Sequence, residues 1–255
     1  MELEYKFKMN VGSNLRYGEI VRTADIRMLH DMDDVIYDKK WLKSQKNFEL
    51  YYMYRNLYKN ESDYIIIKQN KLRYDITVIP PGSLGYEFIK TAGHYHPAVN
   101  EIDLSYTEVY QVLEGKATYI LQKRKVDEEL IRDFIVVKAE KGDNVIIPPD
   151  YGHVTINESN EILIMANWVC DDFSSEYDLI KKMKGMAYLL TKQGFIKNLE
   201  YKFVPKIRYI EPTNFVEYGF KKGVDMYNLI QDIDKLKFLT NPSEFSLLFS
   251  KIIGV

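Results

Sequence analysis

The chain has 255 residues, 46% of them hydrophobic and 28% charged, so it is long enough to bury a core and too apolar to be disordered. Lysine and arginine total 35 against 37 aspartates and glutamates, which excludes the basic excess that a nucleic-acid-binding surface needs. One cysteine excludes an internal disulfide, no apolar stretch approaches the ~20 residues that cross a bilayer, and the first residues lack the features of a signal peptide, so we expect a cytoplasmic protein without a membrane partner.

The first 70 residues mix charged and aromatic side chains, and residues 25–32 form one helical candidate among them. From residue 63 the chain changes to short β-branched and aromatic runs separated by turn residues, which is typical of an antiparallel sandwich or barrel. Within residues 108–122 we expect two strands bent as a hairpin about Gly115, because glycine tolerates the positive φ of such a turn. The other predicted strands are 64–67, 74–79, 134–139, 145–147, 154–157, 162–169 and 186–190.

Helical patterns return toward the C-terminus. Ser174 or Ser175 is expected to cap a short helix that runs to Lys184. Residues 225–233 and 242–249 also fit short helices. We therefore predict three parts, which are N-terminal strands and short helices over 1–70, a barrel over 71–211, and a partly helical C-terminal extension over 212–255 that packs on the barrel or on a second subunit.

The chain has only four histidines, and three of them fall within sixty residues. His94 and His96 stand two residues apart, so on a strand both side chains project from one face. Glu108 begins a predicted strand, and His153 follows a turn and precedes another. Three imidazoles and a carboxylate suit a divalent transition metal such as iron, manganese, nickel or zinc, with positions left open for substrate oxygens. The fourth histidine, His30, stands among acidic residues and is expected to be exposed or to cap a helix.

The order of these residues resembles the two-part signature of the cupin superfamily. The first half is His94-x-His96 followed by Glu108 and, seven residues on, Gly115, and the second half is Gly142-x5-Pro148 followed by His153-x3-Asn157. This resemblance implies an all-β fold, the cupin double-stranded β-helix or jelly-roll barrel. Cupins share a fold and not a reaction, so the reaction has to be sought in further residues.

The longer string 77–96, with Glu108-Val109-Tyr110 and the Pro-Pro-x-x-x-His run that ends at His153, is similar to the cupin-type phosphoglucose isomerases of archaea and some bacteria. The segment 27–32 is similar to the N-terminal part of the same family, and the resemblance covers about residues 20 to 200. It implies metal-dependent interconversion of glucose 6-phosphate and fructose 6-phosphate by proton or hydride transfer between C1 and C2. It also implies a homodimer with one divalent metal per subunit, Fe²⁺ first, with Mn²⁺, Ni²⁺ or Zn²⁺ as alternatives.

The resemblance assigns roles residue by residue. The family's metal ligands correspond to His94, His96, Glu108 and His153. Its phosphate contacts correspond to Thr77, Thr91 and the backbone amide of Gly93, and its pocket tyrosines to Tyr110 and Tyr106. Neutral donors of this kind can hold a phosphate without a basic cluster, in agreement with the near-zero net charge. Glu108 and Tyr110 are the candidate catalytic residues.

Two positions depart from the family. The gap between His96 and Glu108 is longer here and contains two rival ligands, Glu101 and Asp103. Glu108 is preferred, because Gly115 follows it at the motif distance. Ser175 stands where the family carries a late active-site histidine, and no further histidine remains to replace it.

Two other functions stay open at this point. One is a different metal cupin enzyme, either a dioxygenase or another sugar-phosphate isomerase, and Thr77, Thr91 and Gly93 in family register argue against it. The other is a non-catalytic cupin that binds sugar phosphates. That class usually lacks one or more metal ligands, whereas this chain has all four.

Overall fold

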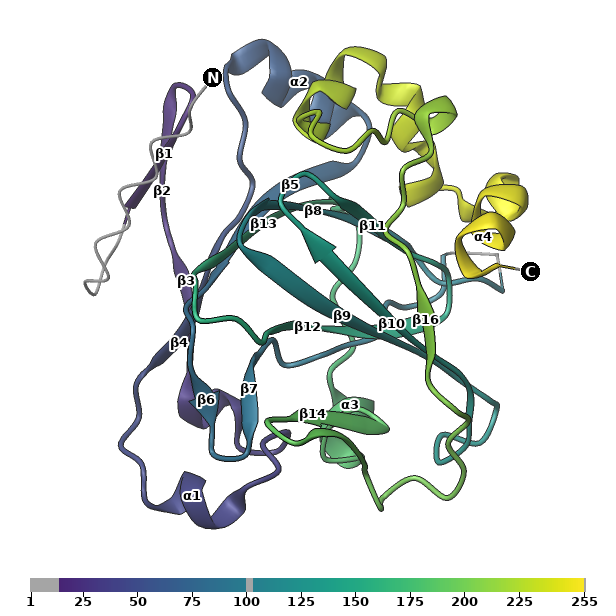
Figure 1. Cartoon of the computed structure of the whole chain (residues 1–255). Coiled ribbons are helices and arrows are strands. Elements are labelled where there is room, and N and C mark those ends of the chain that lie inside the picture. The colour runs from purple at the N-terminus through teal and green to yellow at the C-terminus, as the bar shows by residue number, and fades with distance from the viewer. Residues whose placement is uncertain (1–13, 100–102, 255) are drawn as a thin grey trace.

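The computed structural model of the chain describes residues 14–99 and 103–254, and most of its secondary structure is β (Figure 1). The strands are β1 (Asn14–Tyr17), β2 (Ile20–Thr23), β3 (Asp25–Met28), β4 (Glu49–Tyr54), β5 (Leu72–Ile79), β6 (Ser83–Leu84), β7 (Glu87–Lys90), β8 (Glu108–Glu114), β9 (Lys116–Arg124), β10 (Ile131–Glu140), β11 (Asn144–Ile147), β12 (Tyr151–Asn157), β13 (Leu163–Cys170), β14 (Tyr188–Thr191), β15 (Gly194–Lys197) and β16 (Arg208–Ile210). The α-helices are α1 (Lys39–Lys43), α2 (Glu61–Gln69), α3 (Asp178–Lys182) and α4 (Ser246–Ile253). Short 3-10 helices span Leu29–Met32, Val216–Tyr218, Met226–Leu239 and Pro242–Phe245.

Eight strands form a barrel of two facing sheets. One sheet contains the neighbours β11, β8, β13 and β5, and the other contains β7, β12, β9 and β10. All pairs among these strands are antiparallel, and the chain crosses between the two sheets at every step except β9 to β10. This strand order is that of a jelly roll. The all-β cupin barrel predicted from the sequence is confirmed.

The predicted hairpin about Gly115 is wrong in its pairing, although both strands exist. β8 pairs with β11 and β13, whereas β9 pairs with β10 and β12 in the opposite sheet. Gly115 has a φ of 79° and forms the corner where the chain leaves one sheet for the other. A Cβ atom on Gly115 would lie 2.4 Å from the carbonyl oxygen of Ile162, so this corner excludes a side chain.

Two N-terminal predictions are corrected. Half of the helical candidate 25–32 is strand β3, because Ile26 pairs with Tyr52 of β4, and only Leu29–Met32 is helical. The predicted strand 64–67 lies within helix α2 instead. Asn60 caps this helix by accepting a hydrogen bond from the Asp63 backbone N–H at 2.9 Å, which outweighs the β propensity of three isoleucines.

The predicted helix after Ser174 begins later, at Asp178, and has no side-chain cap. The chain before it is extended because Glu176 and Tyr95 exchange two backbone hydrogen bonds of 2.8 and 3.0 Å. The predicted strand at 186–190 is observed as β14. Among the predicted C-terminal helices, the 225–233 segment is part of a longer 3-10 run with a kink at Asp232, and the 242–249 segment is a 3-10 turn followed by α4.

The C-terminal residues pack on the outer face of the sheet that contains β5 and β13 (Figure 1). The Trp168 indole of β13 donates a hydrogen bond to the Met226 carbonyl at 3.1 Å, and the Tyr227 hydroxyl donates one to Asp63 of α2 at 2.7 Å. A second apolar core of buried residues joins this sheet face to α2 and to the C-terminal helices. The division of the chain at residues 70 and 211 stays a prediction.

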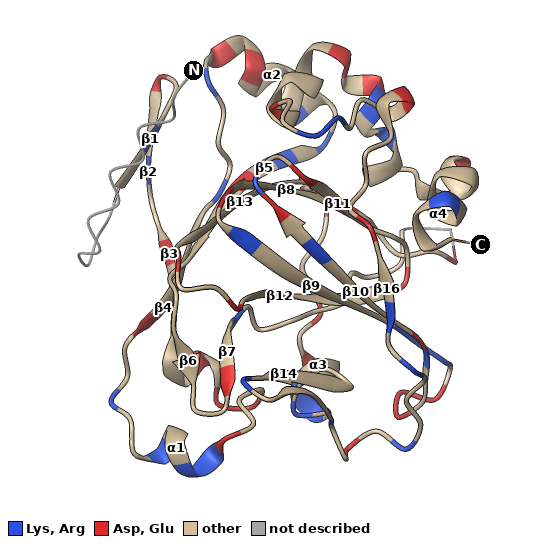
Figure 2. Cartoon of the chain, viewed as in Figure 1, with Lys and Arg blue, Asp and Glu red and all other residues tan. Residues whose placement is uncertain are grey.

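Charged residues of both signs are interspersed along the ribbon in Figure 2, and many form exposed ion pairs such as Lys182–Glu128 at 2.8 Å. Within residues 14–99 and 103–254, the helices are too short or too polar to cross a bilayer.

We predict that Gly115→Ala destabilises the protein by roughly 2–4 kcal/mol, because a methyl group meets the Ile162 carbonyl and the backbone keeps a positive φ. Urea unfolding measures the change. The control is Gly194→Ala. Gly194 also has a positive φ, but no atom lies within 4 Å of the added carbon, so the loss of stability is expected to be about 1 kcal/mol. Equal losses at the two sites would contradict the steric account of the corner.

Candidate active site

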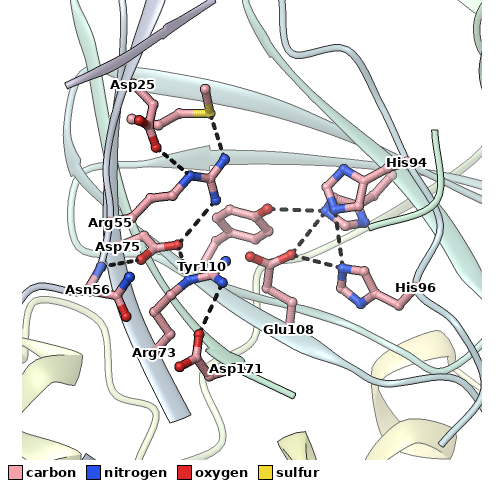
Figure 3. A network of polar contacts seen from close by, with 12 residues as sticks. Asp25, Arg55, Asn56, Arg73, Asp75, His94, His96, Glu108, Tyr110 and Asp171 are labelled. Atoms are coloured by element: carbon pink, nitrogen blue, oxygen red, sulfur yellow. Dashed lines mark hydrogen bonds and ion pairs between the residues drawn. The ribbon is translucent and has the colours of Figure 1, made fainter. Parts of the chain in front are cut away.

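The structure brings together all four residues that the sequence predicted as metal ligands (Figure 3). His94 and His153 face each other across an antiparallel bridge, with backbone N···O distances of 3.2 and 3.0 Å. His96 follows on the same segment as His94, and Glu108 begins β8. One side-chain atom from each residue lies within 4.8 Å of the other three.

The side-chain atoms of this cluster point at one another. The Nε2 atoms of His94 and His96 lie 3.2 Å apart. Glu108 Oε2 lies 3.4 Å from His96 Nε2 and 3.2 Å from His153 Nε2. His96 Nδ1 donates to the Tyr106 carbonyl at 3.1 Å, so the Nε2 atom of a neutral His96 presents a lone pair to the cluster.

Burial and mutual proximity fix the charges of this cluster. Burial, with smaller contributions from His153 and His96, lowers the pKa of His94 well below its ordinary value. Burial also lowers the pKa of His153, although Glu108 partly offsets the shift. For Glu108, burial raises the pKa, but the two neighbouring imidazoles outweigh burial and hold it well below its ordinary value. At neutral pH the site therefore contains an ionised Glu108 beside neutral His94 and His153, the protonation states that metal ligands require.

The donor set fits a divalent cation. Glu108 Oε2 is buried and meets two imidazole nitrogens at 3.2 and 3.4 Å, but no residue in the described ranges forms a well-directed hydrogen bond with it, and an unsatisfied buried carboxylate oxygen is costly. A cation among the three imidazoles would satisfy that oxygen and the facing nitrogen lone pairs together. This cluster can hold a metal ion. Asp103, one of the rival ligands, is exposed and lies outside the cluster, and Glu101 lies outside the described residues.

A cavity of about 360 Å³ opens beside the cluster, and strand β13 forms its floor. Cross-strand pairing places Val169 between Glu108 of β8 and Arg73 of β5. In the next row, Asn167 lies between Tyr110 and Asp75, and Met165 pairs with Thr77 in the row after it. The remaining lining residues are Tyr51, Met53, Arg55, Thr91, Ala92, His94, His96, Phe173, Ser174, Ser175 and Tyr177.

The predicted substrate-binding residues differ in their relation to this cavity. Thr77, Thr91 and Tyr110 line it. Gly93 is buried beside it, between Thr91 and His94 in the chain. Tyr106 lies behind the lining, where its ring stacks on Phe173 with 4.6 Å between centroids.

Sequence reasoning missed three charged residues of the cavity wall, namely Arg55, Arg73 and Asp75 (Figure 3). A signal was available for two of them, because residues 73, 75 and 77 alternate along one strand and therefore share a face. Arg55 lies beyond the end of β4, and only the pairing of β4 with β5 brings it to Asp75.

Arg27 was also missed as a site residue. Its guanidinium carbon lies 6.0 and 5.8 Å from the ring centroids of Tyr51 and Tyr177, which line the cavity. Its Nε atom is buried without a hydrogen-bond partner, and no carboxylate of the described residues lies within 4.0 Å of the guanidinium. Arg27 therefore places a positive charge beside these two tyrosines, with Asp31 as a more distant negative charge.

Comparison with known proteins gives consistent matches. A family model described as glucose-6-phosphate isomerase (GPI) matches residues 26–205, more than half of the chain. A glucose-6-phosphate isomerase of Thermococcus gammatolerans is 29% identical over 198 residues, which are 75% of this chain and 93% of that protein. A protein of the same name from Pyrococcus furiosus is 28% identical over 172 residues, 68% of this chain and 83% of its own. Among solved structures, an oxalate decarboxylase from Bacillus subtilis is 17% identical and covers 49% of this chain and 27% of its own, with a TM-score of 0.34.

We predict that Glu108→Ala weakens metal binding by about a hundredfold or more, because it removes the one carboxylate of the cluster. Metal content after dialysis against limiting free metal measures the loss. Asp103→Ala and Glu101→Ala are the matched controls and are expected to retain the metal of the unaltered protein. A larger loss in either control than in Glu108→Ala would assign the ligand to the other carboxylate.

Proposed function

This chain belongs to the cupin-type glucose-6-phosphate isomerase family, and from that premise we propose that its cavity interconverts glucose 6-phosphate and fructose 6-phosphate in a metal-dependent reaction. The observation that carries the proposal is the convergence of His94, His96, Glu108 and His153 in one cluster, of which the first three line a cavity that Thr77 also lines. The cavity thus offers a cation site and neutral hydrogen-bond donors in one space.

A divalent metal at the cluster would act as a Lewis acid toward the sugar oxygens at C1 and C2. The ligand set suits several transition metals, and the family resemblance favours Fe²⁺ over Mn²⁺, Ni²⁺ and Zn²⁺. A homodimer and a cytoplasmic location are proposed on the resemblance and the sequence alone.

The phosphate is proposed to bind at the Thr77 and Thr91 end of the cavity. Thr91 Oγ1 accepts a hydrogen bond from the Thr155 amide at 3.0 Å, which leaves its own hydroxyl hydrogen free to donate. The Gly93 amide is an additional donor in this assignment. Arg27, behind Tyr51 and Tyr177, adds a positive charge that long-range attraction to a dianion can use.

Tyr110 is proposed to hold a sugar oxygen next to the cluster. Its hydroxyl lies 3.1 Å from His153 Nε2. Burial, together with the negative charge of Glu108, raises the pKa of Tyr110 well above its ordinary value. The phenol therefore keeps its proton at neutral pH and serves as a hydrogen-bond donor.

The hydrogen that moves between C2 and C1 can travel as a proton or as a hydride. A proton route needs a base, and Glu108 is the carboxylate of the cluster. Its lowered pKa makes it a weak base, because the same neighbours that stabilise its charge reduce its affinity for a proton. We therefore propose direct hydride transfer, with Glu108 acting as a ligand and Tyr110 orienting the substrate.

We predict turnover of fructose 6-phosphate in an assay coupled to an NADP-dependent glucose-6-phosphate dehydrogenase. Chelation is expected to abolish the activity, and at least one of Fe²⁺, Mn²⁺, Ni²⁺ or Zn²⁺ is expected to restore it. Absence of turnover with every metal would defeat the proposal, and calorimetric binding of fructose 6-phosphate without turnover would instead identify a non-catalytic sugar-phosphate-binding protein.

A reaction in D₂O distinguishes the two hydrogen-transfer routes. Hydride transfer predicts that glucose 6-phosphate formed from fructose 6-phosphate contains no solvent deuterium at C2, as measured by mass spectrometry after brief conversion. Substantial label at C2 would contradict the hydride proposal and identify a proton route with exchange.

A further inference from the structure

The cavity wall opposite the His/Glu cluster carries a charged network that the proposed reaction does not yet use. Asp75 accepts hydrogen bonds from Arg73 Nε at 2.8 Å and from the Asn56 amide at 2.9 Å. Arg55 Nη1 lies 3.7 Å from the same carboxylate. Figure 3 shows this network on one side of Tyr110 and the His/Glu cluster on the other.

The network is electrically balanced. Arg73 also contacts Asp171 at 3.3 Å, and Arg55 donates to Asp25 at 3.0 Å. Lys68 completes the set with a 2.6 Å ion pair to Asp171, so three cations face three carboxylates. A phosphate dianion placed here would meet Asp75 across the cavity without an unpaired cation to compensate, and like charges at such range repel.

The balance does not exhaust the hydrogen-bonding capacity of these side chains. A guanidinium has five N–H donors, and Arg73 uses Nε for Asp75 and Nη1 for Asp171, which leaves Nη2 without a hydrogen bond to any residue of the described part of the chain. A carboxylate can accept about four hydrogen bonds, and Asp75 accepts fewer. A neutral group that both donates and accepts, such as a sugar hydroxyl, matches this pair.

Register places Asp75 beside the middle of the proposed substrate and Arg73 one row nearer to the end at the cluster. Along β5, Arg73 lies in the row of Glu108, Asp75 lies in the row of Tyr110, and Thr77 lies one row further. A sugar with C1 and C2 at the cluster and its phosphate at Thr77 therefore carries its central hydroxyls past Asp75. The side chain of Asp75 is 5% exposed, and burying an ion network costs free energy that an apolar pair would avoid.

We propose that Asp75 and Arg73 form a subsite for the hydroxyl groups at C3 and C4 of the sugar, and that they determine specificity for the sugar rather than for its phosphate. This inference rests on the proposed isomerase function. The two residues act in binding and not on the hydrogen that is transferred. Removal of a hydroxyl contact that is equally strong before and during the reaction raises KM and leaves kcat nearly unchanged.

The test compares Asp75→Asn with the unaltered protein on fructose 6-phosphate and on its 3-deoxy and 4-deoxy analogues. Asp75→Asn keeps the shape of the side chain and an acceptor for the Asn56 amide, but it loses the negative charge. With the unaltered protein, at least one deoxy analogue is expected to raise KM about tenfold. With Asp75→Asn, the KM for fructose 6-phosphate is expected to rise about tenfold. For this variant, the same deoxy analogue is expected to have a KM less than about twofold higher than that of fructose 6-phosphate.

Further measurements distinguish loss of the hydroxyl contact from damage to the metal site, to the phosphate site or to the fold. Bound metal and inhibition by inorganic phosphate are expected not to weaken in Asp75→Asn, whereas Thr77→Val is expected to weaken inhibition by phosphate. Lys182→Gln, which breaks an exposed ion pair outside the cavity, is expected to leave every KM unchanged. Should Asp75→Asn fail to fold, Arg73→Lys replaces it, because a lysine keeps the charge and loses the guanidinium fork.

Two outcomes would overturn the proposed subsite and leave the proposed isomerase function standing. One is that the effects of Asp75→Asn and of both deoxygenations multiply independently. The other is that Asp75→Asn weakens phosphate inhibition as much as it raises KM. If the unaltered protein neither binds nor converts fructose 6-phosphate with any metal, the proposed function fails and the subsite fails with it.

Discussion

The site depends on one short antiparallel bridge between His94 and His153. Its two backbone hydrogen bonds, of 3.2 and 3.0 Å, bring two imidazoles from distant parts of the chain to a centroid distance of 4.4 Å. The bridge requires a glycine at position 152, because a Cβ there would lie 2.5 Å from the ring of Tyr95. Tyr95 in turn accepts a hydrogen bond from Gln122 of β9 at 2.9 Å, so the barrel wall fixes the segment that carries His94 and His96.

The second element on which the cavity depends is β13, which is buried along its whole length. Its inward side chains, Met165, Asn167 and Val169, separate the His/Glu cluster from the Arg/Asp network. Its outward side chains include Ala166 and Trp168, which belong to the second apolar core. The C-terminal residues contact this outer face rather than the cavity, and they support the floor of the site from behind through the Trp168 hydrogen bond to Met226.

Sequence patterns were informative where the residues of one short segment decide the structure. Short β-branched and aromatic runs at 74–79 and 162–169 predicted β5 and β13, and spacing on short segments predicted the four residues of the cluster. The patterns failed where a contact from elsewhere in the chain decides. Strand β3 forms because β4 pairs with it, and the network at Asp75 forms because β4 and the segment at Asp171 approach β5 from both sides. Helix α2 is a different case, since its isoleucine run favours a strand, whereas the Asn60 cap, which is also visible in the sequence, favours the observed helix.

The charges of the cavity connect its composition to its chemistry. Three of the four histidines belong to the cluster, and the fourth, His30, is exposed and lines a separate surface pocket. Ser175 lines the cavity but has no titratable group. Among the described residues, the carboxylates that line it are Glu108, whose pKa is lowered by its imidazole neighbours, and Asp75, which is ion-paired to Arg73 on the same strand. Neither is placed as an efficient base beside the cluster, since one is stabilised in its ionised form and the other lies two strands away. This arrangement is the basis of the proposed hydride route, in which the substrate hydrogen moves within the substrate while the protein orients its oxygens.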